Sequence, residues 1–227
     1  YRVALTEVAG DELRYAVTEI ARLDYYEGDT LPEDARDARK MIFQSCMDQL
    51  RIIAPESGFP QSPDYYYFQA LCLSLWAKAN GVLESLQRTG ELFDLLETGV
   101  ALSDSYEGGG FNRIMGAVYA KLPNVNPFGP SRDLPRSKEL LEAAIQSPAY
   151  PLTRFPETET GEYHYPNYTI YAETLDLLGR TDEAIEVLEA AIARIDNGDM
   201  PTGREPETRS ELASMRTLLE QFGGARR

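Results

Sequence analysis

The chain has 227 residues, of which 43% are hydrophobic and 26% are charged, and its formal net charge is −15. This composition is typical of a folded globular protein and argues against wholesale disorder. Such an acidic surface repels nucleic-acid phosphates and anionic lipid head groups, so we expect no nucleic-acid partner. No apolar run approaches the ~20 residues that span a bilayer.

The beginning of the chain bears on localisation. The first residue is Tyr1 and not Met. We therefore expect that an N-terminal segment has been removed, by processing or by design, and that a signal peptide or a lipid anchor was lost with it. Whether Tyr1 follows a cleavage site is left open.

Helix signals are frequent along the chain, and strand alternation is almost absent. Prolines precede several periodic segments, as expected in a first helical turn: Pro32, Pro63, Pro135, Pro166 and Pro206. Gly179 and Gly223 follow periodic segments, as expected for C-terminal caps. The predicted helices are Asp11–Tyr26, Pro32–Ile53, Pro63–Asn80, Thr89–Ser103, Phe111–Lys121, Pro135–Gln146, Asn167–Leu178, Asp182–Ile195 and Pro206–Phe222.

The helix predicted over Asp182–Ile195 has the clearest pattern. Thr181 is a suitable N-cap, and two acidic residues follow it at the positive end of the helix dipole. One apolar stripe then recurs at helical spacing, formed by Ala184, Ile185, Leu188, Ala191, Ile192 and Ile195.

A short apolar motif recurs along the chain. Leu95–Val100 resembles Leu140–Ile145, which nearly equals Val187–Ile192, at offsets of 45 and 47 residues. A weaker copy lies at Leu50–Ile53. A period of this length indicates stacked helix pairs, none of which buries its apolar face alone. We predict one all-α domain over residues 1–227, a TPR-like helical-repeat superhelix with about nine helices in four antiparallel pairs plus a capping helix.

Small residues in the last two pairs match the TPR template, in which they allow two antiparallel helices to approach closely. In the final pair, Ala172 and Leu175 are followed by Ala184, Leu188 and Ala191. In the preceding pair, Gly116 and Tyr119 are followed by Ser137, Leu141 and Ala144. The repeat is longer than the ~34 residues of a plain TPR, which indicates degenerate units with insertions.

One stretch is more specific than a generic TPR. It runs from Tyr106 through the glycines Gly108–Gly110 and Arg113 to a Gly-x-x-Tyr-x-Lys-x-Pro tail that ends at Pro123. The helix Leu140–Ile145, the segment Tyr150–Thr153 and the motif Tyr171-Ala172-Glu173-Thr174-Leu175 follow in order. Together they resemble the TRAP-transporter T-component family, which comprises TPR-like periplasmic proteins of tripartite, substrate-binding-protein-dependent transport.

The resemblance covers roughly Tyr65–Ala191, and Tyr65–Trp76 fits it more loosely. It implies a periplasmic, often lipid-anchored protein that associates with a solute-binding protein. It also implies that the protein oligomerises and offers an apolar cavity to a hydrophobic ligand. The loop Asn124–Asp133 departs from the family, whose equivalent loop tends to be glycine-rich, so the partner or its geometry differs if this loop is the contact.

The glycine run and Arg113 have two interpretations each. Gly108, Gly109 and Gly110 open a helix whose free N–H groups could hold an anion with help from Arg113, or they allow a tight turn and close packing against the preceding helix pair. Arg113 forms a buried salt bridge with Glu107 or Glu173, or it contacts a ligand or partner.

Aromatic residues gather in two segments. Tyr65, Tyr66, Tyr67, Phe68 and Trp76 share one predicted helix, and Tyr163, Tyr165, Tyr168 and Tyr171 surround another. They are either core or the lining of a concave binding surface. Four consecutive aromatics cannot all face one way, so we expect some in the core and some near the surface. The candidate binding residues are Tyr66, Tyr67, Trp76, Tyr106, Gly108, Gly109, Gly110, Arg113, Tyr119, Tyr168 and Tyr171.

The sequence carries no recognisable catalytic or metal motif. Its single histidine, His164, has no evident oriented partner, and there is no Gly-x-Ser-x-Gly motif, no Cys–His pairing and no CxxC motif. We therefore predict no enzyme, no cofactor and no metal; an enzyme would need a compact constellation around His164. We interpret Cys46 and Cys72 as buried small hydrophobes, with a disulfide between neighbouring helices left open.

Two functions follow, both based on binding. The first is a periplasmic T-component-like accessory that docks a solute-binding protein and binds a hydrophobic ligand through an aromatic-lined channel. The second is a generic TPR scaffold that recognises a peptide or protein partner in an open polar groove. The loops Leu122–Leu134 and Tyr150–Pro166 are long enough to gate a cavity or contact a partner.

Overall fold

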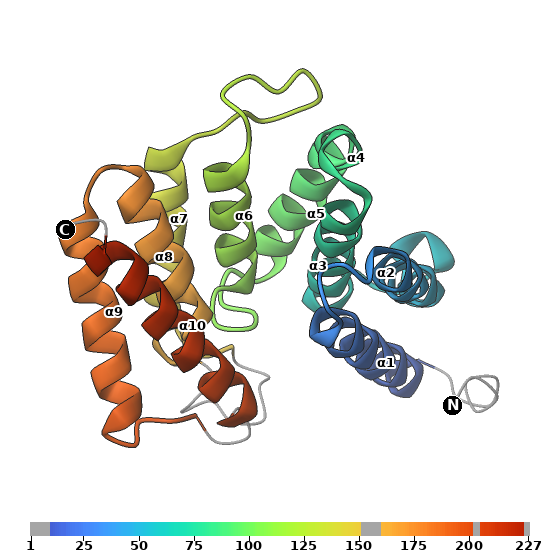
Figure 1. Ribbon diagram of the computed structural model, residues 1–227. Helices are drawn as coiled ribbons and strands as arrows, with labels where there is room; N and C mark the ends of the chain where they lie inside the picture. The colour runs from blue at the N-terminus through green and yellow to red at the C-terminus, as the bar shows by residue number, and fades with distance from the viewer. Residues whose placement is uncertain (1–9, 151–159, 202–204, 225–227) are drawn as a thin grey trace. The chain divides into compact units, whose positions relative to one another are not determined.

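The computed structural model describes residues 10–150, 160–201 and 205–224, which contain α-helices, short 3₁₀ helices and no strand (Figure 1). The predicted all-α class is confirmed. Tyr1 and Pro151–Thr153 lie outside the described residues. The α-helices are α1 (Asp11–Thr30), α2 (Arg36–Leu50), α3 (Pro63–Asn80), α4 (Val82–Gln87), α5 (Thr89–Leu102), α6 (Gly110–Lys121), α7 (Leu134–Ile145), α8 (Pro166–Leu177), α9 (Thr181–Asp196) and α10 (Glu205–Gly224). The 3₁₀ helices are η2 (Arg51–Ile53), η3 (Pro55–Ser57) and η4 (Gly161–Tyr163).

The chain divides into two compact units. Unit 1 comprises Tyr1–Leu102 and Pro127–Gly129 and contains α1 to α5; unit 2 comprises Ser103–Asn126 and Pro130–Arg227 and contains α6 to α10. The single domain expected over residues 1–227 stays a prediction, and each unit is described by itself.

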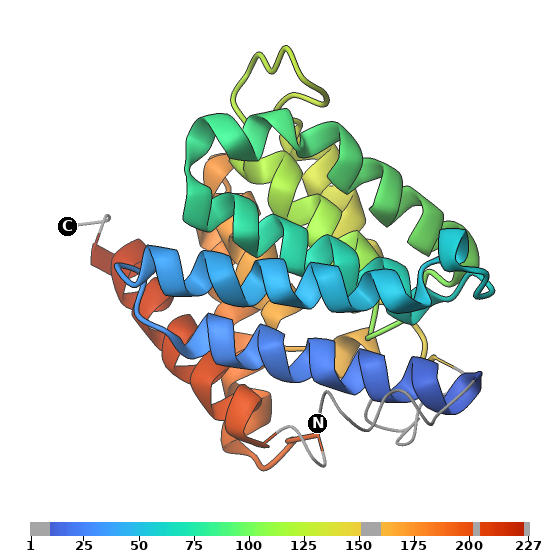
Figure 2. The ribbon, with the colours of Figure 1, turned by 90° about the vertical axis from the view of Figure 1, so that its right-hand side faces the viewer.

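Consecutive helices form antiparallel pairs within each unit (Figures 1 and 2). In unit 1, α1 pairs with α2 and α3 with α5; in unit 2, α6 pairs with α7 and α8 with α9, and α10 packs on α8 and α9. The first helices of neighbouring pairs also touch: α1 packs on α3, α6 on α8, and α8 on α10, whereas α7 and α9 make no comparable contact. We call the α6–α8–α10 layer the inner face of unit 2.

The repeated motif occupies equivalent positions in successive pairs. Its copies lie in α5, α7 and α9, and Leu96, Leu141 and Leu188 are fully buried in the three helices. Three positions after each of these leucines lies a small buried residue: Gly99, Ala144 and Ala191. The weaker copy at Leu50–Ile53 runs from α2 into η2, so it is not the same helical position.

Several element boundaries differ from the predictions. Helix α4 falls between two predicted helices and was not predicted; none of its six residues is buried in the structure. Pro32 precedes α2, which begins only at Arg36, and Gly223 lies within α10 and does not end it. Thr181 is the first residue of α9, where its hydroxyl donates to Asp176 (2.6 Å) instead of capping the helix.

A polar contact ties three helices of unit 2 together inside its core. The Ser137 hydroxyl of α7 donates to the Gly116 carbonyl of α6 (2.7 Å) and lies 3.1 Å from the Thr174 hydroxyl of α8. Ser137 and Thr174 are completely buried, and a Cβ on Gly116 would lie 2.7 Å from Leu141 Cγ. The helices approach this closely because all three residues are small, and the buried hydroxyls have the partners that burial requires.

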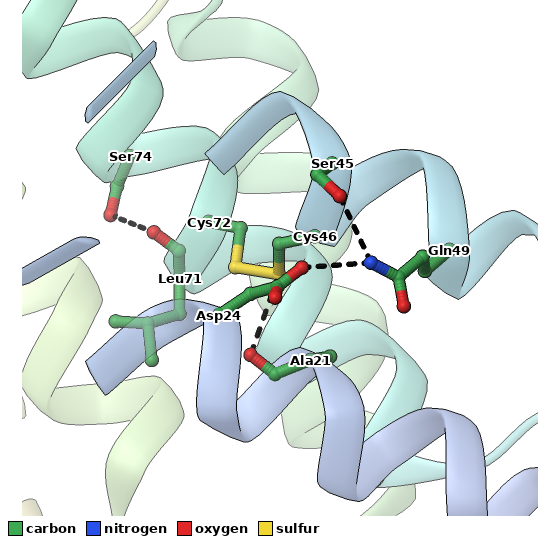
Figure 3. The surroundings of a disulfide bond; sticks show 8 residues. All are labelled: Ala21, Asp24, Ser45, Cys46, Gln49, Leu71, Cys72 and Ser74. Carbon is green, nitrogen blue, oxygen red and sulfur yellow. Dashed lines mark hydrogen bonds between the residues drawn. A yellow bond between two sulfur atoms is a disulfide. The ribbon is translucent and has the colours of Figure 1, made fainter. Parts of the chain in front are cut away.

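Helix α3 lies at the centre of unit 1, against α1, α2 and α5, and a disulfide joins it to α2. Cys46 and Cys72, both fully buried, are bonded with their Cα atoms 6.3 Å apart (Figure 3). Beside it, the Gln49 amide of α2 donates to the Asp24 carboxylate of α1 (2.8 Å) and to Ser45 (3.0 Å). The expectation of free buried thiols is therefore wrong, because stacking α2 on α3 places the two side chains opposite each other.

The disulfide is consistent with an oxidising compartment, where such bonds persist. In the part of the chain that the structure describes, no helix combines the length and apolarity needed to cross a bilayer.

Removing the disulfide should destabilise unit 1. The bond closes a 26-residue separation, so we expect the double variant C46A/C72A to lose about 3 kcal/mol of unfolding free energy. The single tryptophan, Trp76, lies in unit 1, so urea unfolding followed by its fluorescence measures this loss. Reductant should destabilise the wild-type protein and leave the variant unaffected. Two thiols titrated in denaturant without reductant would show that the bond is absent.

Candidate functional site

The glycine run forms a left-handed turn that leads into α6. Glu107, Gly108 and Gly109 all have positive φ, at 50°, 56° and 75°. A Cβ on Gly108 would lie 2.1 Å from the His164 ring, and one on Gly109 would lie 2.6 Å from the Ala144 Cα at the end of α7. The glycines are therefore needed both for the turn and for the close approach of later elements, whereas we predicted packing against the preceding pair.

The amides of this turn bear on the anion hypothesis. The Gly109 N–H donates to the Ser105 carbonyl (3.4 Å), and the Gly110 N–H donates to the Tyr106 carbonyl (2.8 Å). Two of the donors that an anion would need are thus occupied within the turn. This geometry favours the packing interpretation of Gly108–Gly110.

Arg113 is buried on α6 and binds an amide. Its Nη1 donates to the Asn167 Oδ1 (3.0 Å) and to the main-chain carbonyl of Glu107 (3.3 Å). The other predicted partner, Glu173, lies 3.6 Å from the Lys121 Nζ. Arg113 thus connects α6 to the start of α8 and to the turn that precedes its own helix.

Asn167 was not singled out from the sequence, yet it joins more segments than any predicted residue. It is fully buried, and its Nδ2 donates to the carbonyls of Gly161 (2.8 Å) and Gly108 (3.3 Å) while its Oδ1 accepts from Arg113. Its side chain therefore links α8 with η4, the glycine turn and α6. No pattern in the sequence predicts that an asparagine at this position would link these segments.

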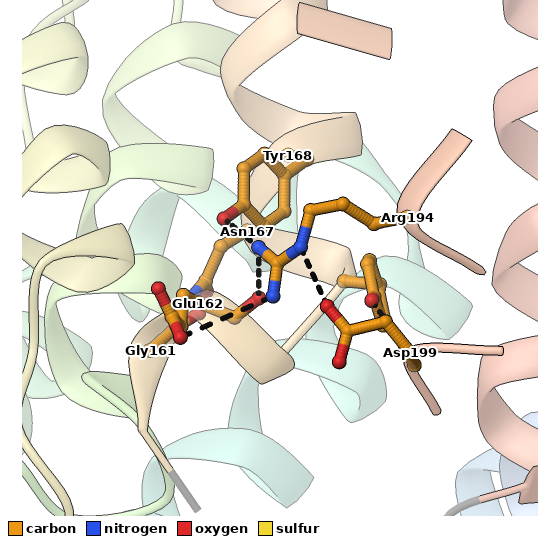
Figure 4. A network of polar contacts seen from close by, with 7 residues as sticks. Gly161, Glu162, Asn167, Tyr168, Arg194 and Asp199 are labelled. Atoms are coloured by element: carbon orange, nitrogen blue, oxygen red, sulfur yellow. Dashed lines mark hydrogen bonds and ion pairs between the residues drawn. The ribbon is translucent and has the colours of Figure 1, made fainter. Parts of the chain in front are cut away.

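Arg194, on α9, is surrounded by aromatic rings and acceptors (Figure 4). Its guanidinium donates to the Asp199 carboxylate (2.8 Å) and the Tyr168 hydroxyl (3.1 Å), and lies 5.3 Å from the centre of the Tyr163 ring. The Tyr165 hydroxyl donates to the Asp199 carbonyl (2.6 Å), and burial raises its pKa to about 12. The predicted residue Tyr168 thus serves to hold η4 and α8 to the end of α9.

Tyr171 lies on another side of α8. Its hydroxyl donates to the Glu142 carboxylate of α7 (2.8 Å), which also accepts from Lys138 (2.6 Å). Burial and the adjacent Glu142 carboxylate raise the pKa of Tyr171. Burial disfavours the charge on Glu142, but the hydrogen bonds from Lys138 and Tyr171 outweigh burial and lower its pKa.

The remaining predicted residues of unit 2 lie on or beside α6. Tyr106 is buried against the rings of Phe111 (6.0 Å between centres) and Tyr150 (5.2 Å). Tyr119 is half-buried, and its carbonyl accepts from the Asp133 amide (3.3 Å).

The aromatics of unit 1 belong to its core. Tyr65, Tyr66, Tyr67 and Phe68 are all buried, which corrects the expectation that some lie near the surface. The reason is that α3 packs against α1, α2 and α5 together. Trp76 is half-buried beneath the Arg88 guanidinium (5.4 Å).

The inner face of unit 2 carries two polar contacts between its helices. The Lys121 ammonium of α6 pairs with the Glu173 carboxylate of α8, and the Thr169 hydroxyl of α8 donates to the Glu211 carboxylate of α10. Both Lys121 and Glu173 are accessible to solvent, with 70% and 39% of their side chains exposed. These four residues form a candidate recognition surface that the sequence analysis did not identify.

Unit 2 also has a small hollow, lined by Tyr163, His164, Tyr165, Pro166, Glu207 and Thr208. Its volume is about 10 Å³, roughly the space that one water molecule needs and far below the roughly 300 to 1,000 Å³ of ordinary small-molecule sites. In the described ranges, no group of three or more His, Cys, Asp or Glu side chains has an arrangement that would hold a metal ion.

The loop between α6 and α7 is internally hydrogen-bonded. Asn126 is buried, and its side chain donates to the Pro130 carbonyl (2.9 Å) while its amide donates to the Ser131 hydroxyl (3.0 Å). Arg132 Nε donates to the Leu122 carbonyl (2.9 Å). Val125 is 80% exposed.

Comparison with known proteins found no matching family model and no matching curated protein.

The glycine turn can be tested with a matched pair of substitutions. Gly109 and Gly179 both have φ of 75°, but a Cβ on Gly179 would meet nothing within 4 Å. We expect Gly179→Ala to cost only the left-handed strain, about 1–2 kcal/mol, and Gly109→Ala to cost about 1–3 kcal/mol more through its clash with Ala144. Thermal unfolding followed by circular dichroism compares them. Equal losses would contradict the packing role.

Asn167→Ala should strongly destabilise unit 2. It leaves the Gly161 and Gly108 carbonyls and the Arg113 guanidinium without their buried partner, which we expect to cost about 2–4 kcal/mol. Asn197 is exposed just beyond α9, and its replacement by alanine should change stability by less than about 0.5 kcal/mol. Denaturant unfolding of both variants measures the difference, and a loss below about 1 kcal/mol for Asn167→Ala would refute the linking role.

Proposed function

We propose that this protein is a TPR-like helical-repeat scaffold that recognises a segment of a protein partner. The observation that carries the proposal is the inner face of unit 2. There the first helices of successive pairs pack directly on one another, and their accessible side chains include the ion pair Lys121–Glu173. Stacked helix pairs commonly use such a face for extended protein segments.

The positions of the aromatic residues support this function over hydrophobic-ligand binding. An apolar channel would need Tyr66, Tyr67 and Tyr106 on its wall, but all three are buried in packed cores. The hydroxyls of Tyr168 and Tyr171 are engaged with Arg194 and Glu142.

The disulfide supports a more specific form of the same proposal. A buried Cys46–Cys72 bond suits an oxidising compartment such as the periplasm. This favours the T-component-like role, in which the recognised partner is a periplasmic solute-binding protein of a TRAP-type transporter. If the protein has the T-component-like role, we also propose that it is lipid-anchored, forms oligomers and binds a hydrophobic molecule.

The inner face is tested by exchanging its charges. The double variant K121E/E173K keeps the ion pair and the net charge but reverses their order across α6 and α8. Peptides selected by display on the wild-type protein should bind this variant about tenfold more weakly in calorimetry. The control R136E/E139R reverses an exposed pair on α7 (3.0 Å) and should bind unchanged.

Two outcomes would contradict the proposal. Equal weakening by both charge-reversed variants would show that the selected peptides sense charge generally and not the inner face. A tightly retained apolar molecule, detected by native mass spectrometry and organic extraction without detergent, would favour the hydrophobic-ligand function instead.

A further inference from the structure

Glu211 places a carboxylate in the contact between α8 and α10. Its side chain is half-buried and accepts a hydrogen bond from the Thr169 hydroxyl of α8. Residues four positions apart share one face of a helix. Glu207 therefore lies beside Glu211 on α10, and Glu173 lies beside Thr169 on α8. Three carboxylates thus occupy the two facing sides of this contact.

Positive charges also lie near this contact. On α6, Lys121 pairs with Glu173 (3.6 Å), and Arg113 is bonded to Asn167 and to the Glu107 carbonyl. The ion pair between α10 and α9 joins Arg216 to Asp196 (2.8 Å) and does not involve Glu211. His164 and Glu207 line the same small hollow.

The partial burial of Glu211 disfavours the ionised form of its carboxyl group. Burial raises the pKa of Glu211 above its ordinary value of 4.5; the Thr169 hydrogen bond and Arg113 oppose the rise, and the Glu207 and Glu173 carboxylates add to it. A carboxyl whose pKa is higher in the folded protein than in the unfolded chain contributes its full stabilisation at pH values below the unfolded-state pKa. That stabilisation is lost as the pH rises through the folded-state pKa.

We propose that the contact between α8 and α10 is a pH-sensitive latch, in which α10 docks firmly while Glu211 is neutral and loosens when it is charged. Apart from the Arg216–Asp196 ion pair, the α10 contact includes an apolar cluster, in which Met215 and Phe222 are buried together with Leu175 and Leu188. Release of α10 would uncover this surface at the end of the repeat stack. Thr169 and Glu211 also belong to the candidate recognition surface, so release of α10 would alter that surface; the experiment below tests the latch without a partner, so its outcome is separate from that of the peptide-binding test.

Hydrogen exchange of peptides from α10 tests the latch, at about pH 5 and about pH 8 and with correction for intrinsic exchange rates. In the wild-type protein we expect protection of α10 to fall at the higher pH, about tenfold for each unit by which the pKa is raised. Glu211→Gln should keep α10 protected at both values. Glu220→Gln removes an exposed carboxylate from the same helix and should behave like the wild-type protein.

Peptides from α3 report whether unit 1 changes as well. The latch predicts pH-independent protection there, because the loosening is local to α10. The proposal is overturned if α10 protection does not depend on pH in the wild-type protein, or if the dependence persists in Glu211→Gln, which would assign it to another group such as His164.

Discussion

Small residues allow the helices of unit 2 to approach closely, and the arrangement of everything above them depends on this approach. At its centre, the Ser137 hydroxyl lies between the Gly116 carbonyl and the Thr174 hydroxyl, so α6, α7 and α8 meet with no bulky side chain between them. The same requirement recurs at Gly109 and Gly161, where an added Cβ would collide with the end of α7. Because α6 and α8 are held this close, Asn167 reaches both Arg113 and the glycine turn.

Much of the repeat architecture follows from local pattern. Leu96, Leu141 and Leu188 recur at nearly constant offsets because each anchors the second helix of a pair, and their complete burial confirms that interpretation. The start of α3 was also predicted correctly: Pro63 begins the helix and Ser62 caps it. Helix α4 was not predicted, because it has only six residues and buries none of them, so it has no apolar stripe facing a core.

The site was less predictable, because its residues are joined by tertiary contacts. Two cysteines 26 residues apart carry no indication of pairing until α2 is stacked on α3. Four successive aromatics are all buried only because three helices surround α3. Arg113 was expected to pair with a carboxylate or to contact a ligand; the structure gives it the Asn167 amide and the Glu107 carbonyl as acceptors, and nothing in the sequence distinguishes Asn167 for this role.

We propose that the inner face of unit 2 is the recognition surface, and that the contacts of Arg113, Asn167 and Arg194 hold its helices in place. The most direct test is to map where a display-selected peptide protects the backbone from hydrogen exchange. Protection confined to α6, α8 and α10 is the predicted result. Protection concentrated on α7 and α9 would contradict it, because it would place the bound peptide on the opposite layer of helices.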